Sequence, residues 1–307
     1  MKTKHFLVGL MALAVICSAS PSWAKTKAKP LPEELEKLDV IGKKVSDEIA
    51  PGVSYYHRYY KDLFGVGDGP LSVHYLIIDW TKTAKDFSLA FATCGGNRRH
   101  PSEMATERRA LAAVNGGYHA TTDPTKPYFQ MKLDGKVIPS MNEGGDTSLA
   151  FNHGEMPVIE SHSKQLLDKY ENVLSGDGIT GFCKNELPAT KAERQKQRAP
   201  RTFVGQNAKD KITVIALCDG RSKRSIGMSY TEESKHLKIF GCEKMVSLDG
   251  GGSSVMVVRD GNKAKHLDIV NVPSDGCERR VCDALLLLDK KSLAADEVKG
   301  KGKKHKK

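Results

Sequence analysis

The sequence predicts an α+β fold, in which one domain of mixed or antiparallel sheets packs against a few helices. Short β-branched and apolar runs outnumber stretches with helical spacing, and turn-forming residues separate most of these runs at short intervals. Of the 307 residues, roughly 240 follow Gly52 without a linker, and a chain of that length buries a sizeable core. We therefore expect a single domain over residues 51–289.

The first 24 residues have the composition of a secretory signal peptide. Lys2 and Lys4 precede an apolar run over residues 6–19, and Ala24 supplies a small residue at the expected cleavage point. No later segment reaches about 18 uninterrupted apolar residues, so no transmembrane segment is expected. Residues 1–24 are therefore expected to be removed, leaving a secreted or periplasmic protein.

The net charge of +11 is concentrated at the two ends of the chain. Two lysines of the signal peptide, three of an N-terminal arm and six of a Lys-rich tail account for the whole excess, which leaves the domain electrically balanced. A nucleic-acid partner is therefore not expected. The tail, residues 290–307, has the composition of a disordered segment that is either merely solvated or touches anionic surfaces. Nothing in the sequence indicates an oligomeric state.

Six cysteines follow the signal peptide, an even number in a chain expected to enter an oxidising compartment. Disulfides are therefore expected, although the spacing does not select their pairing. Zinc binding is the competing interpretation, but no C-x-x-C pair is present and the closest two cysteines have four residues between them. The six are Cys94, Cys183, Cys218, Cys242, Cys277 and Cys282.

The elements can be assigned in chain order. Residues 25–50 are expected to form an arm and one amphipathic helix, because apolar residues recur at helical spacing from Leu31 to Ile49 until Pro51 and Gly52 end it. Next we expect strands over 73–80 and 87–92, a helix over 102–113 with Ser102 as N-cap, a hairpin over 128–138 and a strand over 148–151. The remaining elements are an irregular stretch over 158–200, strands over 212–217 and 285–288, and a helix over 232–240 with Thr231 as N-cap.

The most informative segment places Asp249, three glycines and two serines between two apolar runs that predict strands. Successive glycine N–H groups can converge on an anion, and hydroxyl groups can add further donors. An aspartate beside such a site would repel a phosphate unless it takes part in chemistry or binds another group. A tight hairpin whose aspartate caps its own turn is the competing interpretation, but this many glycines and serines exceed what a hairpin needs.

Four other segments place polar residues at the ends of expected elements. Asn115 precedes two glycines, Arg201 opens a strand, Asp219 ends one, and Asn271 leads into the stretch Glu278-Arg-Arg-Val. Each alone is explained as a turn or a structural ion pair. In this order and spacing, however, the segments AVNGGYH, RTFVG, LCDGR, SLDGGGSSVM and NVPSDGCERRV resemble the phosphodiester glycosidase family, from about residue 51 to residue 288.

The resemblance implies hydrolysis of a sugar-1-phosphodiester, with an N-acetylglucosamine-like sugar, on an α+β mixed-sheet fold in a secreted or luminal setting. Arginine forks and glycine N–H groups suit the anion, while amide and carboxylate groups suit the sugar and the proton transfers. The expected catalytic residues are Asp249, Glu278 and Arg279. The expected substrate-binding residues are Asn115, Gly116, Gly117, Arg201, Thr202, Asp219, Arg221, Gly250, Gly251, Gly252, Ser253, Ser254 and Asn271. Many family members have aromatic residues where His119 follows Tyr118 here, which leaves the choice of substrate open.

The expected substrate is a carbohydrate phosphodiester, in phosphate-linked sugars or in envelope or extracellular polysaccharide. No cofactor is expected, although a divalent cation such as calcium is left open. The alternative is a non-catalytic envelope protein that binds glycan or phosphate, and the intact Asp249 and Glu278 favour catalysis over it. A metal-dependent phosphodiesterase would need a cluster of His and Asp ligands, and the sequence shows no such spacing.

Overall fold

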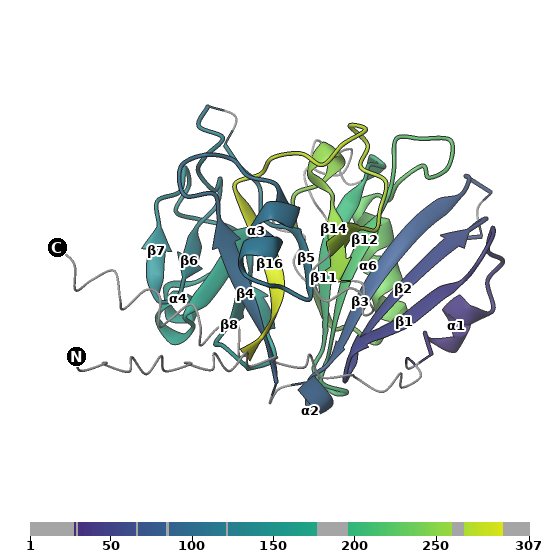
Figure 1. Ribbon diagram of the computed structural model, residues 1–307, viewed down its shortest axis with the longest axis horizontal. Coiled ribbons are helices and arrows are strands. Elements are labelled where there is room, and N and C mark those ends of the chain that lie inside the picture. Colours follow the sequence, from purple (N-terminus) through teal and green to yellow (C-terminus); the bar gives the residue numbers. More distant parts are fainter. Residues whose placement is uncertain are drawn as a thin grey trace, which may run out of the picture.

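The computed structural model describes residue 28 and residues 30–290, except 66, 84–85, 121, 177–195 and 260–266. The expected signal peptide, nearly all of the basic tail and residues 177–195 of the irregular stretch lie outside the described residues. Sheets dominate the domain, and the helices are few (Figure 1). None of the helices in the described part is long and apolar enough to cross a bilayer.

Three sheets make up the domain, and their strand pairings are antiparallel throughout the described residues. The first runs β1 (Val45–Ala50), β2 (Val53–Tyr60), β3 (Leu71–Asp79), β12 (Ile212–Cys218), β11 (Arg201–Asn207), β13 (Lys244–Ser247). The second runs β7 (Lys136–Ile138), β6 (Met131–Leu133), β10 (Asn172–Gly176), β8 (Thr147–Phe151), β9 (Val158–Ser161). The third runs β15 (Leu267–Ile269), β14 (Met256–Arg259), β5 (Ala112–Asn115), β16 (Asp283–Asp289), β4 (Phe87–Thr93).

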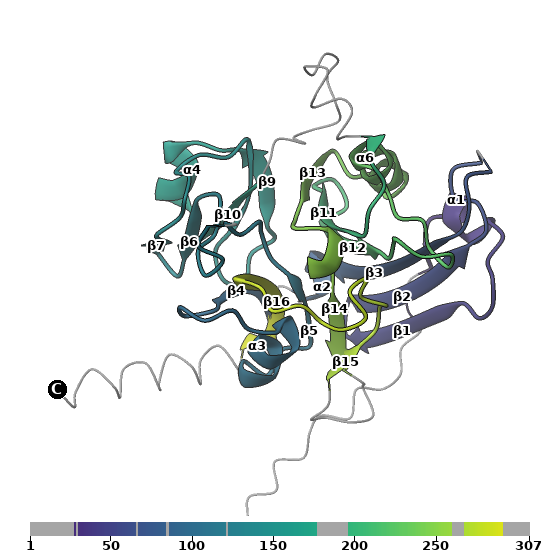
Figure 2. The same cartoon turned by 90° about the horizontal axis from the view of Figure 1, so that it is seen from above.

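One hydrophobic core is shared by all three sheets, and helices cover their other faces (Figure 2). Leu217 of the first sheet, Leu149 of the second and Leu285 of the third are all buried in this common core. The helices α1 (Glu33–Glu36) and α6 (Tyr230–Ile239) cover the first sheet, α4 (Lys164–Lys169) covers the second and α3 (Pro101–Glu107) covers the third. A further short helix, α2 (Trp80–Thr83), follows β3. Successive residues of a strand therefore point alternately into the common core and into a second core between the sheet and its helices. This explains why the strands are apolar on both faces.

Two helix predictions are wrong. The expected helix over 31–49 is only the four-residue α1, and residues 45–50 form β1, which pairs with β2 across a turn where Gly52 has φ +75°. The expected helix over 102–113 ends at Glu107, and its alanine-rich end is β5, the middle strand of the third sheet. Long-range pairing overrides the local pattern in both places, because each segment gains ladder hydrogen bonds and buried side chains as a strand.

Most of the other elements are confirmed. The hairpin over 128–138 is present as β6 and β7, and Asp134 (φ +48°) and Gly135 (φ +79°) form its two-residue turn with the positive φ values of type I′. The strands expected over 73–80, 87–92, 148–151, 212–217 and 285–288 are β3, β4, β8, β12 and β16. The helix α6 also forms, but its N-cap is Ser229 with Glu232 completing a capping box, in place of Thr231.

One pair of cysteines is placed for a cross-link. Cys94 follows β4 and lies opposite Cys282, whose carbonyl accepts a hydrogen bond from the Cys94 N–H at 2.7 Å. Both thiols are buried and free, and their Sγ atoms are 4.0 Å apart. Directly opposite residues of antiparallel strands have the Cα separation that a disulfide requires.

We predict that Cys94 and Cys282 pair when the purified protein is oxidised with glutathione disulfide. The cross-link should raise the free energy of unfolding by about 2–4 kcal/mol relative to Cys94→Ser. Peptide mass mapping without reduction, together with urea unfolding, measures both effects. Recovery of the two cysteines as separately alkylated peptides after oxidation would contradict the prediction.

Candidate active site

The Asn115 side chain joins three segments at the end of β5. Its Nδ2 donates to the Asp249 carbonyl at 2.7 Å, and its Oδ1 accepts hydrogen bonds from Thr202 Oγ1 at 2.7 Å and from the Val255 N–H at 3.2 Å. Asn115 is fully buried, as is Thr202. The amide therefore fixes the strand ends on either side of the glycine loop, residues 249–254, and its polar atoms are engaged within the protein.

Each of the three consecutive glycines lies against a different arginine. A Cβ built on Gly250 would stand 3.6 Å from Arg201 Nη1, and one on Gly251 would stand 3.0 Å from Arg221 Nη2. A Cβ on Gly252 would overlap Arg279 and its partner Asp275. The absence of side chains at these positions thus allows guanidinium groups to approach the loop backbone. Gly251 and Gly252 begin a short 3-10 turn, Gly251–Ser253.

Two of these arginines line an open cleft of about 220 Å³. Arg201 is 7% exposed and is held from several sides: its Nε donates to the Met228 carbonyl, its Nη2 donates to the Gln197 carbonyl, and its guanidinium lies 3.7 Å above the Tyr230 ring. Arg221, in contrast, is exposed. The cleft is lined by Tyr118, Gln197, Arg198, Ala199, Arg201, Arg221, Tyr230, Asp249, Gly250 and Gly251. Among the arginines of this lining, Arg198 is paired with Glu232 and Asp68, whereas Arg201 and Arg221 approach the glycine loop, where guanidinium N–H groups suit an anion.

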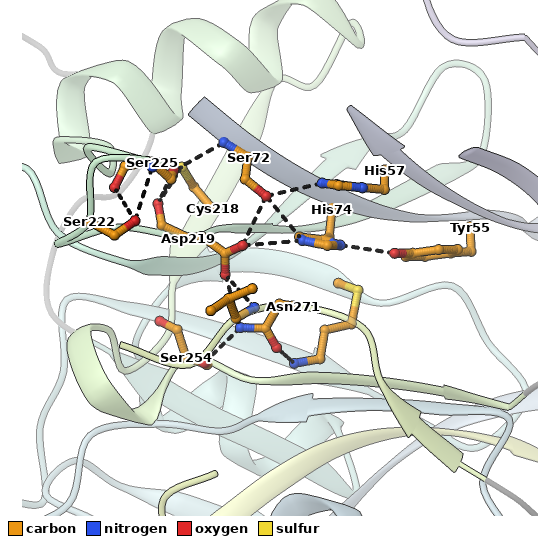
Figure 3. Close-up of polar contacts among 12 residues, drawn as sticks. Tyr55, His57, Ser72, His74, Cys218, Asp219, Ser222, Ser225, Ser254 and Asn271 are labelled. Carbon is orange, nitrogen blue, oxygen red and sulfur yellow. Dashed lines mark hydrogen bonds and ion pairs between the residues drawn. The ribbon is translucent and has the colours of Figure 1, made fainter. Parts of the chain in front are cut away.

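Arg221 has a left-handed backbone, with φ +58°. Few residues other than glycine adopt this conformation, so the surrounding turn must hold it. Ser225 Oγ donates to the Asp219 carbonyl at 2.6 Å, and the backbones of Ser222 and Ser225 hydrogen bond to each other (Figure 3). The turn thereby fixes where the Arg221 side chain leaves the backbone.

Asp219 supports this turn from inside the protein. Its Oδ1 accepts hydrogen bonds from Asn271 Nδ2 at 3.1 Å and from the Val272 N–H at 3.0 Å, and its Oδ2 accepts one from Ser72 Oγ at 2.9 Å (Figure 3). Burial acts to raise the pKa of Asp219, but the contacts with His74, Asn271 and Ser72 outweigh it and lower the pKa below its usual value. The carboxylate therefore stays charged and holds two loops beside the site.

Asn271 extends the same network to the glycine loop. Its Nδ2 also donates to the Ser254 carbonyl at 3.2 Å, and its Oδ1 accepts a hydrogen bond from the Met256 N–H at 2.9 Å (Figure 3). Asp219, Asn271 and Ser254 are all buried, and none of them lines the cleft. These residues position the glycine loop from beneath the cleft, and the substrate contact expected for them stays a prediction.

Asp249 is the carboxylate that faces the cleft. Its Oδ1 accepts a hydrogen bond from the Gly250 N–H at 2.9 Å, and its Oδ2 lies 3.5 Å from His119 Nδ1. The Asp249 N–H donates to the Gly116 carbonyl at 3.0 Å, which ties the aspartate to the turn after β5. The side chains of Asp249 and His119 are each 17% exposed, so the pair is reachable from solvent yet largely enclosed.

Asp283 lies behind this pair and was missed from the sequence. Its Oδ1 accepts a hydrogen bond from the Gly117 N–H at 2.7 Å, while its Oδ2 has no hydrogen-bond partner among the described residues. Burial raises the pKa of Asp283 to about 7, and the nearby charge of Asp249 acts in the same direction. The sequence did contain a signal, namely an aspartate at the start of an apolar run. Burying a charged residue there costs free energy unless the group is paired or hydrogen-bonded, so such a residue is a candidate for a special role.

Glu278 and Arg279 lie away from the lining of the cleft. Glu278 accepts hydrogen bonds from the Ser102 N–H at 2.7 Å and from Ser102 Oγ at 2.5 Å, so it caps the first turn of α3. Arg279 pairs with Asp275 at 2.5 Å and lies 3.4 Å from Ser253 Oγ, against the glycine loop. The structure thus brings Arg279 to the loop but gives Glu278 a capping position at a helix.

The predicted residues therefore separate into three groups, one of which is the pair Glu278 and Arg279 described above. Asp249, Arg201, Arg221, Gly250 and Gly251 line the cleft, together with Tyr118 and Tyr230, which the sequence analysis did not select. The others that are buried around it are Asn115, Gly116, Gly117, Thr202, Asp219, Gly252, Ser253, Ser254 and Asn271. Within the described ranges, no group of three or more His, Cys, Asp or Glu side chains is arranged to hold a metal ion.

The residues that form the cleft lie in a segment of the chain that matches a known protein family. Residues 108–288, more than half of the chain, match the family model of the phosphodiester glycosidases. The chain belongs to this family. The matched residues include β5, the arginine-bearing turn, the glycine loop and the Glu-Arg-Arg-Val stretch, so the family match covers the whole described lining of the cleft.

Solved structures share the fold of this chain. The catalytic domain of zebrafish N-acetylglucosamine-1-phosphodiester α-N-acetylglucosaminidase, auto-inhibited by its pro-peptide, has a TM-score of 0.60 at 18% identity, covering 87% of this chain and 96% of that one. A Burkholderia pseudomallei protein, named as an exported protein, has a TM-score of 0.58 at 16% identity, covering 88% of this chain and all of that one. A Synechocystis protein has a TM-score of 0.58 at 13% identity, covering 80% and 64%.

A curated relative comes from Bacillus subtilis (strain 168), where it is a prophage-derived protein. It is 29% identical over 221 residues, which is 68% of this chain and 32% of the relative. The chain thus spans about a third of the length of that protein.

We predict that Gly251→Ala displaces Arg221 and destabilises the fold. Gly251 has φ +62°, so alanine adds backbone strain of about 1–2 kcal/mol, and its Cβ must also move the guanidinium. Urea unfolding and binding of inorganic sulfate measure the two effects. Gly42→Ala is the matched control, because Gly42 has φ +76° and nothing within 4 Å of its Cβ position. Equal loss of stability and unchanged sulfate affinity in the two variants would contradict the contact with Arg221.

Proposed function

We propose that the protein hydrolyses a glycosyl 1-phosphodiester with an N-acetylglucosamine-like sugar. The observation that carries the proposal is that one cleft contains Asp249 together with Arg201 and Arg221. Membership of the phosphodiester glycosidase family supports the reaction class. The name of the zebrafish enzyme whose catalytic domain has the same fold supports the choice of sugar.

The two arginines would bind the phosphate. Guanidinium groups donate paired hydrogen bonds to phosphate oxygens, and Arg201 is already oriented by its carbonyl contacts and its stacking on Tyr230. An oriented guanidinium loses little entropy when the substrate binds. If the glycosidic C–O bond breaks, the departing phosphate group is an anion, so these charges stabilise it where negative charge develops.

Asp249 would act on the attacking water. Water adds its oxygen to the anomeric carbon, the C–O bond to phosphate breaks with its electron pair on the phosphate oxygen, and the water proton passes to the Asp249 carboxylate. His119 lies 3.5 Å from Asp249 and would orient that carboxylate or share the proton. The acid/base role that the sequence analysis also gave to Glu278 is not part of this proposal, because that carboxylate caps α3.

The substrate would be a phosphate-linked sugar or an envelope or extracellular polysaccharide. The expected signal peptide would bring the protein to such material, and the charge-balanced domain suits a carbohydrate partner better than a nucleic acid. The test uses an N-acetylglucosamine-1-phosphodiester in ¹⁸O-labelled water, with and without a chelator. Label in the sugar shows C–O cleavage, label in the phosphate shows P–O cleavage, and binding without turnover would overturn the proposal in favour of a binding protein.

We predict that Asp249→Asn lowers kcat by about 10²–10⁴-fold, because the amide cannot accept the proton of the attacking water. The same exchange at Glu278 is the matched control, since glutamine still accepts the Ser102 N–H hydrogen bond. Glu278→Gln should change kcat by less than about threefold and lower the free energy of unfolding by about 1 kcal/mol. Initial rates and urea unfolding separate the two variants. A larger loss of kcat in Glu278→Gln than in Asp249→Asn would reverse the assignment.

A further inference from the structure

A buried carboxyl group lies behind the cleft arginine Arg201. Glu233, in the first turn of α6, is 0% exposed, and neither of its oxygens has a hydrogen-bond partner of ordinary geometry among the described residues. Its Oε1 lies 3.4 Å from Arg201 Nε. A carboxyl group with so few polar contacts is costly to bury as an ion, so the arginine is its natural counter-charge.

Arg201 faces two places for an anion. Its Nε is directed to Glu233 and to the Met228 carbonyl, while its Nη1 and Cδ would each stand 3.6 Å from a Cβ built on Gly250, a residue that lines the cleft. The stacking on Tyr230 keeps the guanidinium plane fixed between these two sides. One positive charge therefore interacts with an internal carboxyl group and with whatever anion occupies the cleft.

We propose that Glu233 sets the charge that Arg201 offers to the cleft, so that binding of an anion there is coupled to protonation of Glu233. This inference rests on the proposed function only in taking the cleft to bind an anion. It assigns Glu233 as a positioning residue, which acts through Arg201 and does not touch the substrate.

The groups that face Glu233 support this coupling. Burial raises the pKa of Glu233 to about 8, and Glu232 on the same helix adds to the rise. Arg201 on β11 and the Ser247 side chain on β13 oppose it without cancelling it. The Glu233 carboxyl group therefore changes charge near pH 8.

Two further titratable groups interact with Glu233 and do not change charge in this range. Burial raises the pKa of Tyr118, which lines the cleft, well above its usual value. Burial likewise raises the pKa of the Cys218 thiol at the end of β12. Among these neighbouring groups, Glu233 is therefore the one whose charge responds to pH around 8.

The sign of the coupling follows from linkage. Below about pH 8 Glu233 is neutral and the Arg201 charge is available to the cleft, whereas above it the carboxylate competes for that charge. An anion in the cleft makes ionisation of Glu233 less favourable, so the anion binds with uptake of a proton. Affinity for the anion should thus be highest below pH 8 and fall as the pH rises.

The test measures binding of sulfate to the full protein by titration calorimetry from about pH 6.5 to about pH 9.5 at constant ionic strength. Sulfate keeps its charge over this range, so any change in affinity belongs to the protein. The wild type should lose about 5–10-fold in affinity between these limits, with proton uptake detected in buffers of different ionisation enthalpy. Between about pH 7.5 and about pH 9.5, above the pKa of the buried Asp283 beside Asp249, Glu233→Gln should change by less than about twofold, while the wild type falls.

Matched variants keep the test decisive. Glu160→Gln makes the same exchange at an exposed position on β9 and should reproduce the wild-type profile. Glu233→Gln should also fold, because the raised pKa of Glu233 means that this carboxyl group ionises in the unfolded chain first, which favours unfolding increasingly as the pH rises towards 8, and glutamine removes that effect. Its unfolding temperature relative to the wild type should therefore increase from about pH 5 to about pH 8.

Three outcomes would overturn the inference: a flat wild-type profile, a profile that Glu233→Gln retains, or no sulfate binding at any pH. Hydrolysis of the phosphodiester is measured separately. A protein that shows the proton-coupled sulfate binding without turnover would refute the proposed function and leave the role of Glu233 intact. Turnover without proton-coupled sulfate binding would support the proposed function and refute the role of Glu233.

Discussion

The site depends on one buried amide. Asn115 ends the middle strand of the third sheet, yet its side chain bonds to Thr202 at the end of a strand in the first sheet and to the backbone on both sides of the glycine loop. Because those groups are buried, losing the amide would leave polar atoms without partners. The joint between two sheets therefore fixes the loop on which Asp249 is placed, and the cleft opens at this joint.

The chemistry of the cleft follows from close contact between arginines and glycines. Three guanidinium groups approach the loop where side chains are missing, and two of them face the cleft that contains Asp249. Two buried acids lie behind these groups: the Asp219 carboxylate binds Asn271 beneath the turn that bears Arg221, and Glu233 Oε1 lies 3.4 Å from Arg201 Nε.

Much of the fold could be predicted where local signals decide it. The Asp134-Gly135 turn fixes its hairpin, and the capping residues at Ser229 and Glu232 begin α6 close to the expected position. Local signals failed for residues 45–50 and for the alanine-rich residues 112–115, whose apolar spacing fits a helix as well as a strand. There the outcome depended on partners far away in the chain or beyond a turn, β2 in one case and β14 and β16 in the other.

An aspartate, a glycine run and several arginines at the ends of predicted elements could be recognised from the chain alone as groups that suit an anionic sugar linkage, because the residue itself gives the chemical type of each side chain. Which of these groups meet depends on the fold. In the folded protein Asp249 lines the cleft, whereas Glu278 caps the first turn of α3. Asp219 and Asn271 are buried beneath the loops, where they bind each other. The exposure of a side chain and its hydrogen-bond partners depend on residues from distant segments that pack around it, so the spacing of residues along the chain does not specify them.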